Sequence, residues 1–339
     1  MQKMKYFVTG GTGFIGGRVV KSLLSAGHSV HVLARTPHKA LDLRNAGAII
    51  FRGDVTDKSS MVEAMDQCNG IFHIAADTSI GPKNGASMID TNVRGTHNVL
   101  SLMSELQISK GVYTSTTWIN SNTSGVLADE TYYNEGLYLS DYEKSKWEAH
   151  YNVARSFIFN GLPLVIVMPS LVYGPGDHSP LADSFTSLLR GRLPFLPSGT
   201  SHSWAHVKDV VRGHILAMEK GTVGESYILG GPTHSIIDVF DVAANMSRRR
   251  RAPIHLPPAI IRFFASVVAL SGDVLPIPSY YSSESLRLNA GTTYVSTSEK
   301  AVRELGYSHR SIESGLKDYL VDIASRISRE RLPEESHRS

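Results

Sequence analysis

Three glycines near the start of the chain join an apolar segment to a helix-forming one. Gly10, Gly13 and Gly16 follow the spacing G-x-x-G-x-x-G. Residues 5–8 before them are typical of a strand, and residues 16–26 are typical of an amphipathic helix. A pyrophosphate approaches the backbone closely at such a strand-to-helix turn, where the first N–H groups of the helix receive its charge. The spacing therefore predicts a dinucleotide-binding loop. The residues assigned to this loop are Gly10, Thr12, Gly13, Phe14 and Ile15.

The end of the second predicted strand, residues 29–33, bears on which dinucleotide is bound. NAD-binding units usually carry Asp or Glu there for the adenosine ribose, whereas this chain has Ala34 followed by Arg35. A guanidinium binds a 2′-phosphate through two hydrogen bonds and keeps its charge, and Lys39 or Arg44 follows close behind. The segment favours NADP and leaves NAD possible. The alternative is that Arg35 is a solvated surface residue.

A carboxylate follows the third predicted strand, residues 48–51. Asp54, with Val55 beside it, fits a contact with the adenine amino group. Asp54 would equally fit as the cap of the helix expected near Lys58.

Apolar strands alternate with helical periods along the first two thirds of the chain. This alternation predicts an α/β fold with a doubly wound, parallel Rossmann sheet. Two long helices, near residues 89–106 and 141–159, are expected to lie side by side. The strands are expected at residues 5–8, 29–33, 48–51, 70–74, 111–114, 164–168 and 226–229.

The composition shifts toward Pro, Gly and Ser from Tyr173 onward, which marks entry into a smaller, mostly C-terminal substrate lobe. A length of 339 residues also exceeds one ordinary domain. The expected boundaries are a nucleotide-binding domain over residues 1–172 with 206–230 returning to it, a substrate lobe over 173–205 and 231–325, and a flexible tail over 329–339.

Composition excludes several other classes of protein. The single cysteine, Cys68, excludes an internal disulfide framework and is typical of a reducing compartment, so a cytoplasmic location is expected. The net charge of +3 is mild, and Arg248–Arg251 lack interleaved aromatic residues, which is typical of a solvated helix end. We predict no nucleic-acid partner and no metal site.

The longest apolar stretch, Ala259–Leu270, contains Arg262 and is too short to cross a bilayer. No membrane span is therefore predicted. We expect this stretch to be a buried helix of the second lobe; the alternative is an amphipathic segment that rests on a membrane surface.

Tyr142 and Lys146 are four residues apart on the second long helix, so their side chains share a face. A tyrosine hydroxyl with a pKa of about 10 is a weak acid, and a neighbouring ammonium lowers that pKa by favouring the phenolate. The pair predicts a general acid assisted by a lysine that also reaches a nicotinamide ribose. Hydroxyl groups in the segment Tyr113–Thr117, just past the fifth strand, are placed to orient a reacting carbonyl.

Taken together, these motifs resemble the extended short-chain dehydrogenases/reductases of the NAD-dependent epimerase/dehydratase superfamily. The resemblance spans nearly the whole chain. Further segments that carry it are Gly53–Val55, His73–Ala76, Asn92–Thr96, Val172–Asp177 and His206–Val210.

The resemblance implies roles for individual residues. It implies that Tyr142 is the acid/base, that Lys146 activates it and binds the ribose, and that Thr116 orients the carbonyl, with Ser115 as the alternative. Members are often dimers through the two long helices, so a homodimer is expected. The cofactor contacts that the resemblance adds are Ala75 and Ala76 along the adenosine and ribose, Asn92, and Pro169 and Ser170 beside the nicotinamide.

Two departures from the family pattern narrow the expected substrate. His202 stands where sugar-nucleotide enzymes usually carry an arginine for the diphosphate. Thr116 is followed by Thr117, where dehydratases tend to have an acid. The likeness is greatest to dihydroflavonol 4-reductase-like and 3β-hydroxysteroid dehydrogenase-like members, and an apolar, aromatic lining suits a ring or acyl ketone. The predicted substrate contacts are Thr78, Ile80, Trp118, Tyr173 and Trp204, the alternative for both tryptophans being packing between the lobes.

We therefore expect an NADP-preferring ketoreductase that acts on a mainly apolar ketone or secondary alcohol. The first alternative is an epimerase or isomerase that retains NAD and acts on a nucleotide sugar. The second is a non-catalytic, cofactor-sensing protein, which would not need the Tyr142–Lys146 pair. Polar contacts to the substrate are expected from His202, His206, Lys208 and Asp209; the alternative for His206–Asp209 is that they join the lobes.

Overall fold

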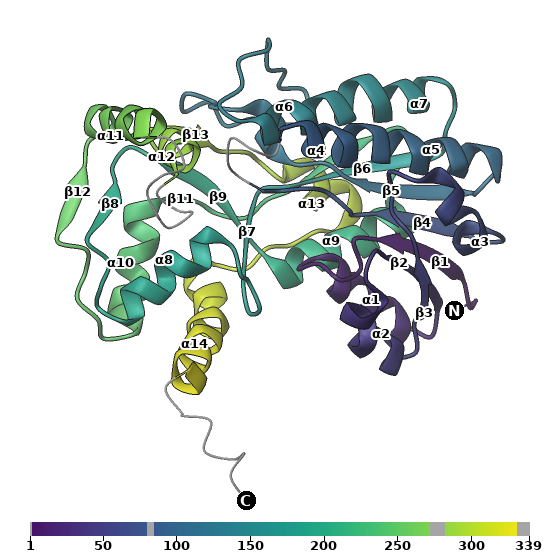
Figure 1. Cartoon of the computed structure of the whole chain (residues 1–339), viewed down its shortest axis with the longest axis horizontal. Helices are drawn as coiled ribbons and strands as arrows, with labels where there is room; N and C mark the ends of the chain where they lie inside the picture. The colour runs from purple at the N-terminus through teal and green to yellow at the C-terminus, as the bar shows by residue number, and fades with distance from the viewer. Residues whose placement is uncertain (1, 80–84, 272–281, 331–339) are drawn as a thin grey trace, which may run out of the picture.

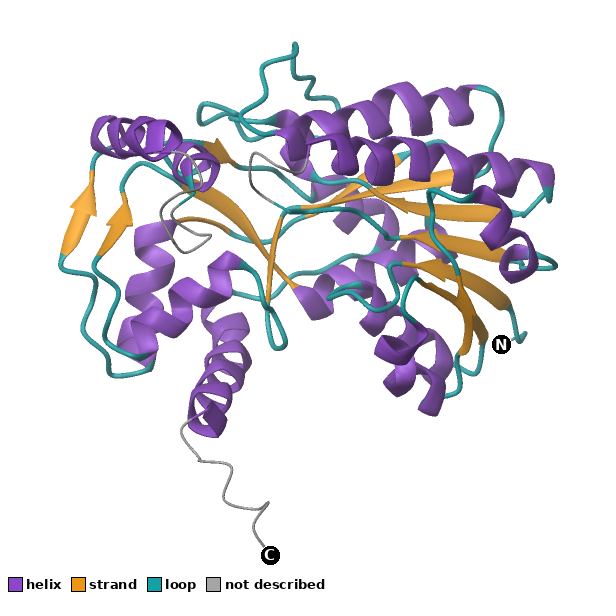
Figure 2. Ribbon diagram, in the orientation of Figure 1, coloured by secondary structure: helices purple, strands orange, loops and turns teal. Residues whose placement is uncertain are grey.

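A parallel sheet flanked by helices and a second, mostly C-terminal lobe make up the fold (Figure 1). The computed structural model describes residues 2–79, 85–271 and 282–330. Figure 2 shows the strands of the large sheet side by side, with helices covering both faces.

The central sheet has seven parallel strands in the order β10-β6-β5-β4-β1-β2-β3. The chain order reverses between β1 and β4, and ligands bind at such a switch point in open α/β sheets. The predicted strands agree with the observed ones to within one residue at each end, and the predicted fold class is confirmed. The strands are β1 (Lys5–Thr9), β2 (Ser29–Ala34), β3 (Ile49–Arg52), β4 (Gly70–His73), β5 (Lys110–Thr114), β6 (Leu164–Pro169) and β10 (Ser226–Leu229).

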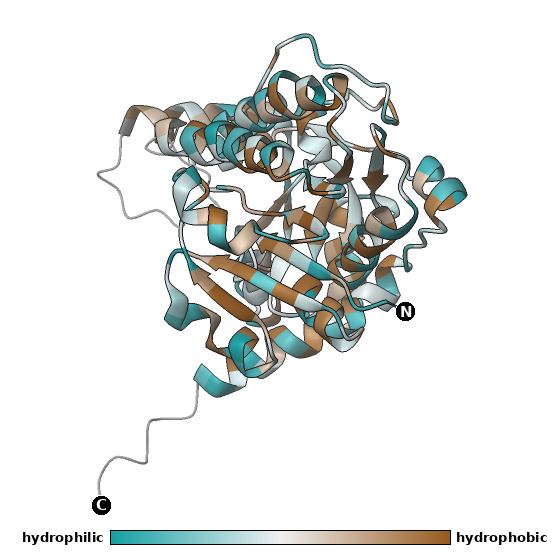
Figure 3. Cartoon of the chain, turned by 90° about the vertical axis from the view of Figure 1, so that its right-hand side faces the viewer, coloured by the Kyte–Doolittle hydropathy of each residue, from teal (hydrophilic) through white to brown (hydrophobic). Residues whose placement is uncertain are grey.

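Side chains alternate between the two faces of this sheet, and each face has its own core. Phe7 packs in one core and the next residue, Val8, packs in the other. Hydrophobic residues gather on the central strands, while the outer helices also carry hydrophilic ones (Figure 3). On the Val8 face lie α1 (Gly16–Ser25), α2 (Leu41–Asn45), α9 (Val207–Lys220) and α13 (Glu299–Leu305). On the Phe7 face lie α3 (Val62–Met65), α5 (Gly95–Glu105) and η5 (Glu148–Ala154).

The two predicted long helices lie side by side (Figure 1), and each contains a π-helical segment. The first consists of α4 (Gly85–Ile89), η3 (Asp90–Arg94) and α5. The second consists of α6 (Asp141–Trp147), η5 and α7 (Arg155–Phe159). Wider turns of this kind often occur at functional sites. The short 3₁₀ segments are η1 (Pro37–Ala40), η2 (Lys58–Met61) and η4 (Thr117–Asn120).

The second lobe combines small sheets with packed helices. The strands β7 (Leu171–Tyr173), β9 (Ser201–His206), β11 (Thr233–Ser235) and β13 (Thr293–Tyr294) form one sheet, and β8 (Phe195–Pro197) pairs with β12 (Ile254–Leu256). The core of this lobe lies among α8 (Pro180–Leu189), α10 (Ile236–Met246) and α14 (Ile312–Glu330). A separate small cluster joins α11 (Pro258–Ser271) to α12 (Ser283–Leu288).

The segment that begins α9 joins the two parts of the molecule. Asp209 accepts three hydrogen bonds from Arg310, two of them from the guanidinium, at 2.7–3.1 Å. Both His206 and Lys208 contact Asp318 of α14, at 3.1 and 2.6 Å. These contacts support the alternative in which His206–Asp209 joins the lobes.

Three expectations about the second lobe differ from the structure. The α11 helix was expected to be buried, but only one stripe of it is: Ile261 is 1% exposed and Phe263 is 66% exposed. The tail was expected from residue 329, whereas α14 continues to Glu330. Residues of α13, assigned to the substrate lobe, pack in the core of the central sheet. Apolar content predicts a helix without predicting which of its faces is covered.

Among the described ranges, no helix has both the length and the apolar character needed to cross a membrane. In the same ranges, no three His, Cys, Asp or Glu side chains gather in a way that would hold a metal ion.

Candidate active site

A cavity of about 1160 Å³ lies at the carboxyl ends of the central strands, where the second lobe meets the sheet. Its wall includes the ends of β1, β2, β5 and β6 and the residues after β4. The volume exceeds that of a typical single-ligand pocket, and so it suits a dinucleotide together with a substrate.

The glycine loop forms one end of this cavity, as its spacing predicted. Gly10 has φ +69°, and a Cβ there would lie 2.6 Å from the backbone nitrogen of Ala75. Only glycine fits a position that is both left-handed and this close to a neighbouring backbone. The first turn of α1 carries no acidic side chain, so nothing there repels a phosphate. The loop fits a dinucleotide pyrophosphate. All five residues assigned to it line the wall, namely Gly10, Thr12, Gly13, Phe14 and Ile15.

The predicted cofactor contacts divide into those that line the cavity and those that do not. Arg35 is exposed and lines it, whereas Lys39 and Arg44 do not. Asp54 lines the wall and accepts from the backbone N–H and the hydroxyl of Thr56, both at 2.9 Å. The helix cap proposed for Asp54 belongs instead to Asp57, which accepts from Ser59. The other predicted contacts in the wall are Val55, Ala75, Ala76, Pro169 and Ser170.

Asn92 was assigned to the cofactor but does not line the cavity. Its side chain exchanges two hydrogen bonds with the backbone of Asp77, at 2.7 and 2.9 Å, and donates a third to Ser145 Oγ at 3.0 Å. These partners use both N–H groups of the amide and one lone pair of its oxygen, so Asn92 ties the loop after β4 to α6.

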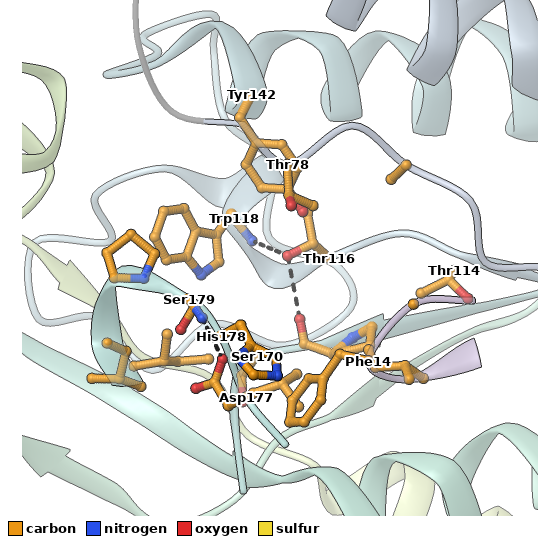
Figure 4. A pocket seen from close by; sticks show the side chains of 18 of the residues that line it. Phe14, Thr78, Thr114, Thr116, Trp118, Tyr142, Ser170, Asp177, His178 and Ser179 are labelled. Carbon is orange, nitrogen blue, oxygen red and sulfur yellow. Dashed lines mark hydrogen bonds between the residues drawn. The ribbon is translucent and has the colours of Figure 1, made fainter. Parts of the chain in front are cut away.

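Tyr142 lies in the first turn of α6, whose start is fixed by the Ser140 hydroxyl that accepts from the Glu143 N–H at 3.2 Å. Figure 4 shows Tyr142, Thr116 and Trp118 together on one side of the cavity. Burial raises the pKa of Tyr142 to about 12, although hydrogen bonding with Thr116 opposes that rise. The expected lowering of this pKa by the Lys146 ammonium is therefore wrong: burial has the largest effect, and the group that opposes it is Thr116 rather than Lys146.

Lys146 is buried, and its ammonium already has two protein acceptors. It donates to the Tyr113 hydroxyl at 3.1 Å and to the Thr114 carbonyl at 2.8 Å. One N–H therefore remains for a ligand in the cavity that Lys146 lines. Burial lowers the pKa of Lys146 to about 7, so its charge changes near neutral pH.

A buried polar chain lies behind Lys146 and leads to the glycine loop. Tyr113 hydrogen bonds with Thr96, whose own hydroxyl donates to the Asn92 carbonyl at 2.6 Å. Thr96 therefore accepts from His73 Nε2 at 3.0 Å, and His73 Nδ1 accepts from the Thr9 hydroxyl at 2.8 Å. Burial lowers the pKa of His73 to about 3, which keeps this imidazole neutral. No sequence motif predicted this chain, because its members come from five separate segments.

The two candidates for the carbonyl-orienting hydroxyl both line the cavity but have different partners. The Ser115 hydroxyl is bonded to the buried His150 at 2.8 Å. Thr116 Oγ1 accepts from the Trp118 N–H at 3.2 Å and donates to the Pro169 carbonyl at 3.3 Å, the two hydrogen bonds of Thr116 drawn in Figure 4. It also hydrogen bonds with Tyr142.

The predicted substrate contacts are placed unevenly. Thr78, Trp118 and Trp204 line the cavity, and Ile80 lies outside the described residues. Tyr173 does not line it: this side chain is 1% exposed and packs against Trp204 and Tyr319 in the core of the second lobe. The strand β7 turns Val172, its neighbour, toward the cavity instead. Lining residues that carried no sequence signal include Phe195, Ile236, Phe240, Ile261, Leu286 and Leu288.

Comparisons with known proteins agree with this architecture. Residues 6–230 match the NAD dependent epimerase/dehydratase family. A Synechocystis protein, named provisionally as a dihydroflavonol 4-reductase, is 32% identical over 92% of this chain and 92% of its own length. A Stigmatella aurantiaca ketoreductase of 4-hydroxy-2-methyl-3-oxo-4-farnesyl-3,4-dihydroquinoline-1-oxide is 28% identical over 91% of this chain and 92% of its own.

Among solved structures, a UDP-glucose 4-epimerase from Thermotoga maritima has a TM-score of 0.77 at 24% identity, covering 96% of this chain and 100% of that one. At that identity the likeness concerns the fold alone. The catalogued enzymes of this group are NAD(P)-dependent oxidoreductases and epimerases. The chain belongs to the NAD-dependent epimerase/dehydratase family, the extended short-chain dehydrogenases/reductases, and is an NAD(P)-dependent enzyme.

Proposed function

We propose that the protein is an NADP-preferring reductase of a mainly apolar ketone, with Tyr142 as its proton donor. The observation that carries the proposal is that Tyr142, Thr116 and Lys146 all line one cavity that begins at the glycine loop. The second-lobe side of that cavity is mainly apolar and aromatic, which favours a ketone over a diphosphate.

A bound nicotinamide supplies the hydride in this proposal. Tyr142 Oη hydrogen bonds to the carbonyl oxygen of the substrate and releases its proton there as negative charge develops. Thr116 hydrogen bonds with the phenol, and it orients the same carbonyl by turning its hydroxyl proton from the Pro169 carbonyl to the substrate. Lys146, held by Tyr113 and Thr114, places its charge near Tyr142, where it favours the phenolate left after proton transfer.

The preference for NADP rests on Arg35. This guanidinium is exposed at the cavity wall directly after β2, the place where an acid would receive an unmodified ribose. Its planar donors suit a phosphate group.

The test of the proposal is the Tyr142→Phe variant, assayed with NADPH and apolar aryl ketones. General acid catalysis contributes about 10²- to 10⁴-fold, so kcat should fall by at least about 100-fold while NADPH still binds. Tyr227→Phe is the matched control, because Tyr227 is buried in the same sheet but does not line the cavity. Turnover by Tyr142→Phe at the wild-type rate would remove Tyr142 from this role.

One observation favours a second candidate, an epimerase that retains NAD: residues 6–230 match the NAD dependent epimerase/dehydratase family. Protein stripped of nucleotide should bind NADPH more tightly than NADH if it is the proposed reductase. Co-purified NAD that does not exchange, with turnover of a nucleotide sugar and no net change in nicotinamide absorbance, would favour the epimerase.

A further inference from the structure

A buried polar atom without a protein partner needs an explanation, and in the wall of a cavity a bound ligand that completes the hydrogen bonding is one. Among the described residues that line the cavity, two carry such an atom: Ser170, through Oγ, and His202, through Nδ1. Ser170 follows β6 beside Thr116 and Pro169, in the half of the cavity proposed for the nicotinamide. His202 belongs to β9 in the second lobe and lines the substrate half; its Nδ1 is enclosed by protein, and its Nε2, which has no partner among the described residues, is the ring nitrogen left for a ligand.

The sheet and three aromatic rings hold the His202 side chain in place. Its register neighbours are Tyr294 on β13 and His234 on β11. The imidazole stacks on the Tyr294 ring, with centroids 5.4 Å apart and planes at 6°, and meets the Trp204 ring edge-on at 6.1 Å. At 3% exposure, His202 has no room to swing toward another protein acceptor or donor.

A single indole separates His202 from the proposed proton donor. The Trp118 ring lies 6.1 Å from the Tyr142 ring, which it meets edge-on, and 6.2 Å from the His202 ring, on which it stacks. A carbonyl at Tyr142 and a group at His202 would therefore lie about one bicyclic ring system apart on the same ligand.

The charge of this half of the cavity decides which group fits. Burial lowers the pKa of His202 to about 4, so the imidazole is neutral at pH 7 and offers one donor and one acceptor. From Leu181 to Asn289, none of the described residues in the cavity wall is Lys, Arg, Asp or Glu. A neutral oxygen matches these surroundings, whereas a phosphate or carboxylate would be left without a counter-charge.

We propose that His202 is a substrate-binding residue that hydrogen bonds a second, uncharged oxygen of the substrate, a hydroxyl or carbonyl placed across a ring from the reacting ketone. This inference rests on the proposed function and extends it: the substrate class narrows from an apolar ketone to a neutral hydroxylated or dicarbonyl ketone. His202 contributes selectivity and takes no part in proton transfer.

The test compares tetralone with its ring-hydroxylated derivatives as substrates for the wild type and for His202→Phe, which keeps a flat ring against Tyr294. In the wild type, kcat/KM for at least one hydroxylated derivative should exceed that for tetralone about tenfold. In His202→Phe this preference should disappear, because kcat/KM for the hydroxylated derivative falls to the level of that for tetralone. His202→Gln, which keeps a donor and an acceptor, should restore part of the preference.

His234→Phe is the matched control, because His234 is the other register neighbour on the same sheet and does not line the cavity. The inference about His202 is overturned if His202→Phe keeps the preference for hydroxylated derivatives. It is also overturned if the wild type reduces tetralone but shows no such preference. Both outcomes leave the reductase proposal standing. If the wild type reduces none of these ketones, the reductase proposal fails. In that case the His202 contact is tested by binding alone. Tetralone and its hydroxylated derivatives are titrated into the NADPH complexes of the wild type and of His202→Phe, and binding is followed by nicotinamide fluorescence.

Discussion

Replacing Tyr113 with phenylalanine removes one of the two protein acceptors of the Lys146 ammonium without changing the size of the buried ring. The hydroxyl accepts from Lys146 Nζ at 3.1 Å, and Thr114 supplies the other acceptor at 2.8 Å. Since a neutral amine needs these acceptors less than an ammonium does, the loss destabilises the charged form of Lys146. We therefore expect the pKa of Lys146 to fall further.

The size of the effect follows from the starting pKa of about 7. A hydrogen bond to a charged group contributes about 1.5 kcal/mol at the lower end of its range, which corresponds to a decrease of about one pKa unit. The fraction of charged Lys146 at pH 7 then falls from about a half to about a tenth. If catalysis needs the charged form, kcat/KM falls as pH rises through this pKa, and in Tyr113→Phe that fall occurs about one unit lower.

The assay is kcat/KM for NADPH between pH 5 and pH 9, because this parameter reports ionisations of the free enzyme. We expect a loss of about fivefold at pH 7, about tenfold above pH 8 and almost none at pH 5. Tyr227→Phe removes a buried hydroxyl that bonds Glu304 and the Thr222 backbone, far from Lys146, and should leave the profile in place. If kcat/KM of a folded Tyr113→Phe protein falls at the same pH as that of the wild type, the assigned link between Tyr113 and the charge of Lys146 is refuted.

Three other changes give distinct results. Arg35→Ala should weaken NADPH binding about tenfold or more and leave NADH binding nearly unchanged, as measured by nicotinamide fluorescence, with Arg44→Ala as the control outside the cavity; equal losses for both nucleotides would count against a 2′-phosphate contact. Gly10→Ala should destabilise the fold by about 2 kcal/mol or more in urea denaturation and abolish nucleotide binding, because its Cβ would meet the Ala75 backbone at 2.6 Å in a left-handed conformation. Retained nucleotide binding would contradict the role assigned to the glycine loop. Lys146→Met should eliminate turnover. It should also reduce the increase in stability between pH 7 and pH 9, which the lysine contributes because its folded pKa, about 7, lies below its unfolded one. Thermal melts at both values of pH measure this increase, and an increase as large as that of the wild type would contradict a depressed pKa.

Local patterns sufficed to predict the elements and loops whose role is set by the backbone. The strands of the central sheet and the glycine loop follow from apolar periodicity and from the close approach of Gly10 to Ala75, and both are found where the sequence predicts them. Tyr142 and Lys146 share a helix, and helical spacing alone brings both to the cavity wall.

Side-chain directions, pKa values and ring contacts that depend on segments far apart in the sequence could not be predicted from local patterns. Tyr173 stands in a motif that locates it near the cavity, but the direction of its side chain is set by how β7 pairs with β9. The pKa of Tyr142 depends on burial by residues from several elements, which reverses the expected direction. The pairing of His202 with Tyr294 arises only when β9 and β13, some ninety residues apart, become neighbours.

The proposed proton donor, Tyr142, and the second-lobe wall of the cavity are joined through successive residues of one helix. Tyr142 faces the cavity, while the next residue, Glu143, is fully buried and accepts from the Tyr294 hydroxyl at 2.6 Å. Tyr294 in turn stacks on Trp118 at 4.7 Å and on His202 at 5.4 Å. Burial raises the pKa of Glu143, and its hydrogen bonds from Tyr294, Leu139 and Ser121 oppose that rise by favouring the carboxylate. A displacement of the second-lobe wall would therefore break hydrogen bonds to a buried carboxyl group. The His202 ring and the Tyr142 hydroxyl, which are proposed to bind and to protonate the substrate, are thus held in one geometry.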